Sequence, residues 1–155
     1  MGELTLKSNF KNNAVIPVKH TCDGDNVNPL IEMLNVPAEA KSLVFIIDDP
    51  DATGGVIWDH WVLFNIDPKT HYIPEDSLPS GAVKGKNSFG KLNYGGPCPL
   101  RGNAAHHYRF KLYVLDSLLK LEEGATKADV EREMGNHILS QTMLTGLYER
   151  KPEDV

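Results

Sequence analysis

The chain has 155 residues, of which 41% are hydrophobic and 24% charged, and its formal net charge is −5 at pH 7. These values predict one globular domain over residues 1–155, and the acidic balance argues against a nucleic-acid partner. Because the apolar runs are short, the start lacks a basic region before an apolar one, and there are only two cysteines, we expect a cytoplasmic protein with reduced thiols and no stable membrane insertion.

Strands dominate the first half of the predicted structure. Alternating or β-branched apolar residues predict strands over residues 4–7, 31–36, 42–48 and 56–66. Strict alternation places five side chains of the last of these on one face, which should line a core or a pocket: Trp58, His60, Val62, Phe64 and Ile66. We expect Trp58 and Trp61 to pack in the core, with a rim at a pocket mouth as the alternative.

A long irregular region, residues 74–105, follows and is rich in glycine and proline. A loop of this length inside a small domain is more often functional than idle. It leads into a predicted strand over residues 106–116, in which alternation separates two faces. One face carries His106, Tyr108, Phe110, Leu112 and Val114, and the other carries His107, Arg109, Lys111 and Tyr113.

One helix is clearly predicted near the C-terminus. Thr126 and Asp129 have the spacing of a capping box, and apolar residues recur at helical intervals at Val130, Met134 and Ile138. This helix should cover the sheet, and residues 143–150 should form a short strand or an extended tail. The elements together predict a mainly β fold with few helices.

The strand over residues 42–48 runs into three carboxylates in the segment Asp48-Asp49-Pro50-Asp51. Alone, such a segment most often forms a solvated turn. Clustered acids at the end of a buried strand also repel one another and lose solvation, so they are commonly retained for hydrogen bonding or for an ionisable ligand site. The nearby His60 favours the second interpretation.

Histidines on two strands, the carboxylates and the long loop suggest a pocket at one end of the sheet. Imidazole and tyrosine groups can donate to anionic oxygens, and loop N–H groups can form an anion nest. Taken alone, His106 is also consistent with a hydrogen-bonded residue at a strand end. His107, on the opposite face, fits that interpretation better still.

Several motifs occur in a characteristic order along the chain, from about Leu4 to Arg150. They are Thr21-Cys22-Asp23-Gly24, Asp48-Asp49-Pro50-Asp51-Ala52, His60-Trp61, Asn87-Ser88-Phe89-Gly90, Tyr94-Gly95-Gly96-Pro97-Cys98-Pro99 and His106-His107-Tyr108. In this combination the chain resembles the phosphatidylethanolamine-binding protein family, and more narrowly its bacterial and archaeal branch of Raf-kinase-inhibitor-like proteins.

The resemblance implies a large central antiparallel sheet, a smaller sheet, peripheral helices and a small cavity for phosphate or phosphorylethanolamine. The positions that match the family's ligand-binding residues are Asp49, Asp51, His60, Gly96, Pro97, His106 and Tyr108. At two places the chain differs from the family pattern, which affects how far the family's residue roles apply to it. Residues 53–55 put glycines in the rim where proline is common, and His107 replaces an arginine, so an ion pair with the acidic loop becomes absent or pH-dependent.

We therefore expect a binding protein for a small anion, in which Asp49 orients an imidazole and recognises any attached amine. No catalytic residue, cofactor or metal is required. The alternative is a phosphoester hydrolase or another hydrolase, with Ser88 as nucleophile or a metal on the aspartates and histidines. Ser88 lacks the glycine that precedes the serine of a nucleophile elbow, and no His-x-x-x-His or Cys-x-x-Cys pair occurs.

The partners that the resemblance implies include a kinase or a protease bound around the pocket. No sequence feature supports a homodimer, which stays open. Cys22 and Cys98 both lie in loops expected near the pocket, and we expect free thiols there, with a disulfide or a metal pair as the alternatives.

Overall fold

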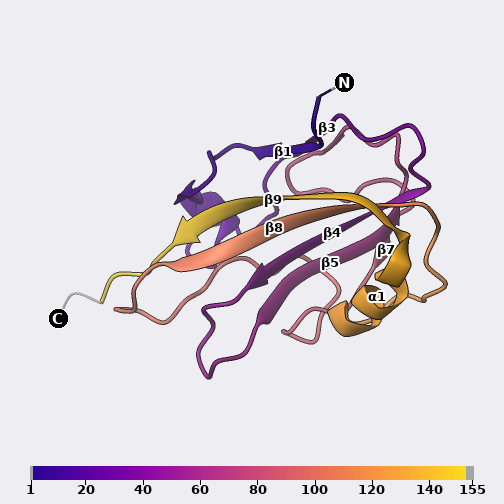
Figure 1. The fold of residues 1–155 in the computed structure, drawn as a ribbon. Helices are drawn as coiled ribbons and strands as arrows, with labels where there is room; N and C mark the ends of the chain where they lie inside the picture. Colours follow the sequence, from indigo (N-terminus) through magenta and orange to yellow (C-terminus); the bar gives the residue numbers. More distant parts are fainter. Residues whose placement is uncertain (1, 153–155) are drawn as a thin grey trace.

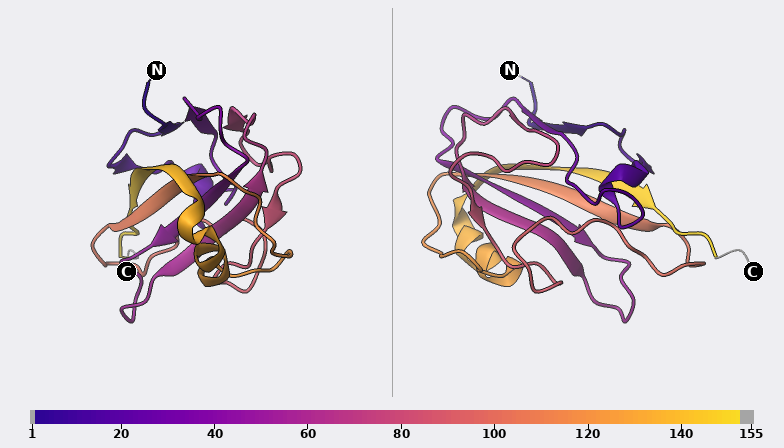
Figure 2. Two further views of the ribbon diagram at one scale, coloured as in Figure 1. Left: turned by 45° about the vertical axis from the view of Figure 1, so that its right-hand side comes forward. Right: turned by 180° about the vertical axis from the view of Figure 1, so that it is seen from behind.

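A six-stranded sheet runs through the centre of the molecule, and a three-stranded sheet lies over one of its faces (Figure 1 and Figure 2). The computed structural model describes residues 2–152. The large sheet has the order β2-β9-β8-β4-β5-β7, formed by β2 (Ala14–Val15), β4 (Ser42–Asp49), β5 (Trp58–Ile66), β7 (Val83–Lys84), β8 (His106–Leu115) and β9 (Ile138–Tyr148). The small sheet has the order β1-β3-β6, formed by β1 (Thr5–Ser8), β3 (Ile31–Leu34) and β6 (Tyr72–Ile73).

The predicted mainly β fold with two sheets is confirmed, but the large sheet is mixed. Its other neighbouring strands are antiparallel, whereas β2 runs parallel to β9, with Ala14 opposite Gly146 and Val15 opposite Leu147. Two residues that pair across so long a stretch of chain leave no local pattern, so the sequence could not predict this pairing.

Two hydrophobic clusters fill the two faces of the large sheet. The larger cluster lies between the sheets and joins Leu6, Ile31 and Met33 of the small sheet to residues of β4, β5, β8 and β9. The smaller cluster lies between the sheet and the helix α1 (Lys127–Met134), which contributes Val130 and Met134. Covering both faces explains why every residue of β4 is buried and why its sequence reads as a continuous apolar run rather than an alternation.

Successive side chains alternate between the two faces of the sheet along β8, but this alternation is broken along β5. As predicted, Tyr108, Phe110, Leu112 and Val114 all join the larger cluster. In β5, however, the larger cluster contains Trp61, Leu63 and Ile66, whereas Val62 and Phe64 face α1. The prediction of one shared face for Trp58, His60, Val62, Phe64 and Ile66 is therefore wrong.

Two irregularities in the pairing of β4 with β5 cause this difference. Ile47 pairs with Trp61 but Asp48 pairs with Asp59, which leaves His60 as an extra residue in β5. A second shift lies between the pairs Leu43–Ile66 and Phe45–Leu63, where Asn65 has a φ of 54°. A β-bulge redirects the side chains beside it, so His60 and the larger cluster share one side of the sheet.

The helix α1 is shorter than the sequence predicts. Its capping box is present, since the Thr126 side chain accepts from the Asp129 N–H and the Asp129 side chain accepts from the Thr126 N–H. The helix ends at Met134, followed by Gly135 and the short 3₁₀ helix η2 (Gly135–His137). Another 3₁₀ helix, η1 (Val18–His20), lies in the N-terminal loop. Ile138 does not belong to the helical face, because it begins β9.

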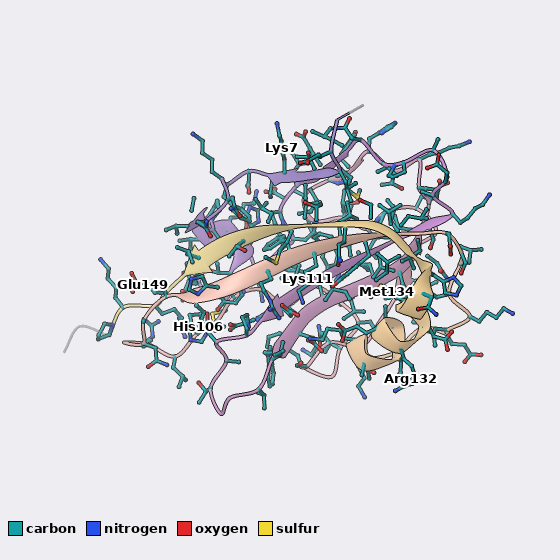
Figure 3. The ribbon with its side chains drawn as sticks, in the orientation of Figure 1. Lys7, His106, Lys111, Arg132, Met134 and Glu149 are labelled. Carbon is teal, nitrogen blue, oxygen red and sulfur yellow. A yellow bond between two sulfur atoms is a disulfide. The ribbon has the colours of Figure 1, made fainter. Side chains whose placement is uncertain are left out.

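The C-terminal segment forms a strand of 11 residues rather than a short strand or tail. It pairs with β8 along its length, from Ile138 opposite Leu115 to Tyr148 opposite His106. Figure 3 shows how β8 connects the two ends of the molecule, with His106 at one end, Lys111 midway and Met134 of α1 near the other. Within residues 2–152, none of the helices has the length and hydrophobicity needed to cross a bilayer.

Candidate functional site

A cavity of about 230 Å³ lies where β4 ends and where β5 and β8 begin. The β4–β5 loop and the loop before β8 form its walls. The lining residues are Asp49, Ala52, Thr53, Trp58, His60, Phe89, Cys98, Pro99, Leu100, His106 and Tyr108. Four of the seven sequence-predicted site residues are thus brought together here: Asp49, His60, His106 and Tyr108.

Asp49 and His106 form a buried pair in this cavity. Asp49 is 3% exposed as a residue, and its Oδ2 lies 2.7 Å from Nδ1 of His106. Its Oδ1 accepts from the backbone N–H of Asp51 at 2.8 Å. Since Nδ1 of His106 is occupied by the carboxylate, Nε2 is the ring nitrogen that remains for a ligand. Asp49 therefore orients the imidazole, as the sequence predicts.

His60 is fixed by the loop that covers it. Its Nδ1 lies 2.7 Å from the carbonyl oxygen of Gly95, and because a carbonyl only accepts, Nδ1 must carry a proton. The neutral ring therefore presents an unprotonated Nε2. Burial, the largest influence, lowers the pKa of His60 below its ordinary value, although the bond to Gly95 and the charge of Asp49 act in the opposite direction. The buried ring is neutral at neutral pH.

Aromatic rings surround these polar groups. Tyr108 lies edge-on to His60, with ring centroids 5.3 Å apart, and stacks on His106 at 6.2 Å. Burial, followed by the charge of Asp49, raises the pKa of its hydroxyl, which stays protonated at any ordinary pH. Phe89 contacts both Trp58 and His60 edge-on, each with 5.5 Å between centroids.

The sequence prediction missed several wall residues as site residues. Phe89 and Leu100 line the cavity and are 43% and 57% exposed. Trp58 lines the cavity, which was the alternative to packing in the core, whereas Trp61 packs in the core as expected. In the sequence, large apolar side chains within a loop rich in glycine, proline and polar residues are the signal that could have identified Phe89 and Leu100.

Asp51 lies beside the cavity but does not line it. Its Oδ2 accepts from the backbone N–H and from Nδ1 of His107, both at 2.8 Å. Burial acts to raise the pKa of Asp51, but the bonds from His107 outweigh it, so the pKa lies below its ordinary value. The contact between residue 107 and the acidic loop is therefore present, and hydrogen bonds from His107 make it. A direct ligand contact of Asp51 stays a prediction.

Gly96 and Pro97 also lie outside the cavity lining. The N–H of Gly96 donates to Oδ1 of Asn26 at 2.8 Å, and a Cβ at this position would come within 2.3 Å of the His20 carbonyl oxygen. The N–H of Gly95 donates to the carbonyl oxygen of His60 at 3.1 Å. Both N–H groups thus hold the loop in place, and a role for Gly96 or Pro97 in ligand binding stays a prediction.

Cys22 and Cys98 form a disulfide, so the expectation of free thiols is wrong. Their Cα atoms are 5.4 Å apart although the residues are separated by 76 positions in sequence. The backbone N–H of Cys22 also donates to the carbonyl oxygen of Pro97 at 3.1 Å. Since Cys98 lines the cavity, the disulfide ties the cavity wall to the N-terminal loop.

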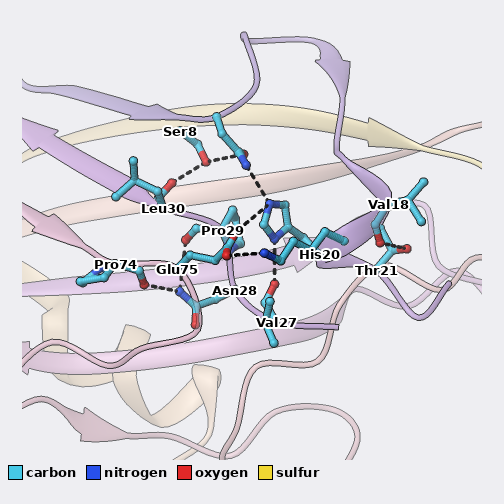
Figure 4. A network of polar contacts seen from close by, with 12 residues as sticks. Ser8, Val18, His20, Thr21, Val27, Asn28, Pro29, Leu30, Pro74 and Glu75 are labelled. Atoms are coloured by element: carbon cyan, nitrogen blue, oxygen red, sulfur yellow. Dashed lines mark hydrogen bonds and ion pairs between the residues drawn. The ribbon is translucent and has the colours of Figure 1, made fainter. Parts of the chain in front are cut away.

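The N-terminal loop is itself held by buried polar contacts around His20 (Figure 4). Nδ1 of His20 donates to the carbonyl oxygen of Val27 at 3.0 Å, and Nε2 accepts from the side chain of Asn9 at 2.8 Å. The amide of Asn28 donates to the carbonyl oxygen of Pro74 at 3.0 Å. Both ring nitrogens of His20 are therefore occupied, which assigns this histidine a structural role.

Asp48 faces the other side of the sheet, where it binds three cations. Its carboxylate is fully buried, with Oδ1 2.7 Å from Nε of Arg109 and Oδ2 2.9 Å from Nζ of Lys111 and 3.2 Å from Nζ of Lys127. Lys127 also contacts Oδ1 of Asp59 at 2.8 Å. Burial acts to raise the pKa of Asp48, but the hydrogen bonds from Arg109 and Lys111 outweigh it, so the pKa lies below its ordinary value.

The hydrolase alternative has two arrangements, Ser88 as a nucleophile or a metal held by acids and histidines. Ser88 does not line the cavity, and its Oγ accepts from the backbone N–H of Asp59 at 2.7 Å. In the part of the chain that the structure describes, no three side chains among His, Cys, Asp and Glu are grouped to hold a metal. The site can therefore bind a ligand through two imidazoles and a hydroxyl within apolar walls.

Comparison with known proteins agrees with this arrangement. The family model for phosphatidylethanolamine-binding protein matches residues 6–149. A UPF0098 protein of Pyrococcus abyssi is 46% identical over 159 residues, which cover 97% of this chain and 88% of that protein.

Two crystal structures share the fold over the full length of their own chains. The Chlamydia trachomatis protein CT736, a PEBP homolog, is 36% identical with a TM-score of 0.91, and Escherichia coli YbcL is 31% identical with a TM-score of 0.89. Each comparison covers 97% of this chain and 100% of the other. The chain therefore belongs to the phosphatidylethanolamine-binding protein family, in its UPF0098/YbcL branch of bacteria and archaea.

Proposed function

We propose that this protein binds a small anion, such as phosphate or the phosphorylethanolamine headgroup, in the cavity at Asp49 and His106. The observation that carries the proposal is the orientation of the two histidines. The carboxylate of Asp49 and the carbonyl of Gly95 each engage one ring nitrogen, so that Nε2 of His106 and Nε2 of His60 remain as the polar groups for a ligand.

The charges in the cavity determine how an anion binds. Asp49 is engaged by His106 and by the N–H of Asp51, so its negative charge is partly compensated before any ligand enters. His60 is neutral in the free protein and accepts at Nε2. An anionic oxygen is bound there only if His60 takes up a proton or if the ligand brings a donor, as an ammonium or a protonated phosphate does.

Binding without turnover is favoured over the hydrolase alternative. The hydroxyl of Ser88 is bonded to the backbone of Asp59 and lies outside the cavity lining, so it is not placed to attack a bound phosphoester. Binding of a kinase or a protease near the cavity, and location in the cytoplasm, stay predictions from the sequence. The disulfide bears on the location, because such bonds persist chiefly in oxidising compartments or in hyperthermophiles.

Replacing His60 by alanine is expected to weaken binding of phosphorylethanolamine by about tenfold to a hundredfold, the range for loss of a hydrogen bond to a charged group. Asp49→Ala should weaken it comparably, since His106 then loses its orienting partner. Isothermal titration calorimetry with phosphorylethanolamine, inorganic phosphate and ethanolamine measures this and separates the anionic part of the ligand from the amine.

His137→Ala is the matched control, because His137 pairs with Asp116 on the exposed surface and lies outside the cavity lining. It should bind like the wild type. Wild-type protein with no affinity for any of the three compounds, or variants that bind as tightly as the wild type, would contradict the proposal.

Anion affinity is expected to increase as the pH falls from about 8 to about 5.5, across the imidazole range. The pKa of His60 is lowered in the free protein, and a bound anion stabilises the protonated ring, so binding takes up a proton. The affinity then changes by up to about tenfold per pH unit and is lost as the pH rises. Sulfate is the suitable probe, because its charge is constant over this range.

His60→Gln is the informative variant for this pH dependence. A glutamine amide donates near the position of Nε2 without taking up a proton, so its sulfate affinity should depend less on pH. An equal pH dependence in the variant and the wild type would show that the proton is taken up elsewhere.

A further inference from the structure

The two strand positions that precede the pocket histidine and the pocket aspartate carry like charges. Asp48 precedes Asp49, Asp59 precedes His60, and Asp48 pairs directly with Asp59 across β4 and β5. Like charges directly opposite each other on neighbouring strands destabilise the pair. Both carboxylates face α1, on the far side of the sheet from the cavity, and Asp48 is fully buried. This point of the sheet therefore needs a cation between the strands.

Lys127 supplies that cation from the first residue of α1. Its Nζ lies 2.8 Å from Oδ1 of Asp59 and 3.2 Å from Oδ2 of Asp48, and its side chain is 12% exposed. Arg109 and Lys111 also bind Asp48, but both come from β8 on the other side of β4. Lys127 thus joins the two strands that meet at the bulge, whereas Arg109 and Lys111 join β4 to β8.

The bulge at this point determines where His60 is directed. His60 is the extra residue between the pairs Asp48–Asp59 and Ile47–Trp61. The loop between β7 and β8 holds the backbone of the bulge. Asp59 and Ser88 exchange hydrogen bonds, and the N–H of Gly95 donates to the carbonyl oxygen of His60. On the face of the sheet that α1 covers, Lys127 holds the side chain of Asp59. The direction of the imidazole depends on both supports.

We propose that Lys127 is a positioning residue for the anion cavity, acting through the sheet by holding Asp59 against Asp48 and so fixing the bulge that directs His60. The effect of Lys127 on anion binding rests on the proposed function. The effect of Lys127 on the orientation of the His60 ring does not require a ligand. Lys127 does not line the cavity, and its ion pairs are with Asp48 and Asp59.

Lys127→Met should change the ring ¹⁵N shifts of His60 in ligand-free protein, away from the single Nδ1–H tautomer that the bond to Gly95 selects. Sulfate affinity should fall on the order of tenfold, since small displacements of binding groups carry costs of this size or larger. Lys127→Arg should restore both, because a guanidinium can bridge two carboxylates.

Lys111→Met is the matched control, because it removes a comparably buried lysine from the same carboxylate and leaves the contact to Asp59 intact. It should keep the wild-type ¹⁵N shifts of His60 and change sulfate affinity by less than about twofold. If Lys127→Met does not fold, Lys127→Gln takes its place, because it removes the positive charge between Asp48 and Asp59 and keeps a polar side chain there.

The outcomes separate this proposal from the proposed function. Wild-type His60 shifts in the folded variant, whether Lys127→Met or Lys127→Gln, would overturn the positioning role. Altered shifts in protein that binds no anion would leave the positioning role standing and refute the proposed function. Altered shifts in Lys111→Met as well would show a general effect of lost stability and would also overturn the proposal.

Discussion

Reduction of the Cys22–Cys98 disulfide is expected to lower the free energy of unfolding by about 4.5 kcal/mol, because the bond closes a long loop in the unfolded chain. The separation of 76 residues between the cysteines sets this magnitude. Urea unfolding of the oxidised protein and of the Cys22→Ser/Cys98→Ser variant, followed by circular dichroism, measures the difference.

The variant should still fold, since Asp23 next to Cys22 keeps its contacts with Tyr148 and Arg150. It should also bind anions more weakly, because Cys98 belongs to the cavity wall and the loop that holds His60 loses its covalent anchor. A difference in unfolding free energy below about 1 kcal/mol would contradict the first expectation and would indicate that the unfolded chain retains structure around the two cysteines.

Replacing Asp48 by alanine is expected to cost about 3 to 5 kcal/mol of stability, because removal of one member of a buried ionic network leaves the others uncompensated. The fully buried carboxylate contacts Arg109, Lys111 and Lys127, which come from two different elements. Thermal and urea unfolding at neutral pH check the magnitude.

The pH dependence of unfolding gives a second measure of the contribution of Asp48 to stability. Since the pKa of Asp48 is lowered in the folded protein, its contribution is complete above its ordinary pKa, about 3.9, and is lost as the pH falls through the folded value. The wild type should therefore lose stability below about pH 4, more steeply than Asp48→Ala. Asp116→Ala, at an exposed pair with His137, is the control and should behave like the wild type. Parallel pH profiles for the wild type and Asp48→Ala would contradict the assignment.

The sequence predicted those parts of the fold whose signals are local. Alternation identified β8 and its two faces, and the capping box identified the start of α1. Alternation failed in β5, because the register of two bulges depends on the partner strand and not on β5 itself. The end of α1 was misplaced for a similar reason, since pairing with β8 draws Ile138 into β9.

The candidate site divides in the same way. Asp49, His60, His106 and Tyr108 line one cavity, and their binding of a ligand stays a prediction. The contacts of Gly96 and the pairing of Cys22 with Cys98 depend on how two loops distant in sequence pack together. No local sequence pattern reveals this packing. Asp48 lies at the end of a predicted strand, and its three cations come from β8 and α1. The sequence could not predict that these elements meet at Asp48.

The position of the last strand in the large sheet affects how the chain can fold during synthesis. Among the elements of residues 2–152, β9 comes last, yet it lies between β2 and β8 and not at an edge of the sheet. Figure 1 shows it beside β8. While residues 138–148 are still inside the ribosome, one side of β8 is unpaired and β2 has no neighbour in the sheet. The nascent chain therefore exposes one edge of β8 until residues 138–148 have emerged, and a chaperone would protect the chain most during this interval.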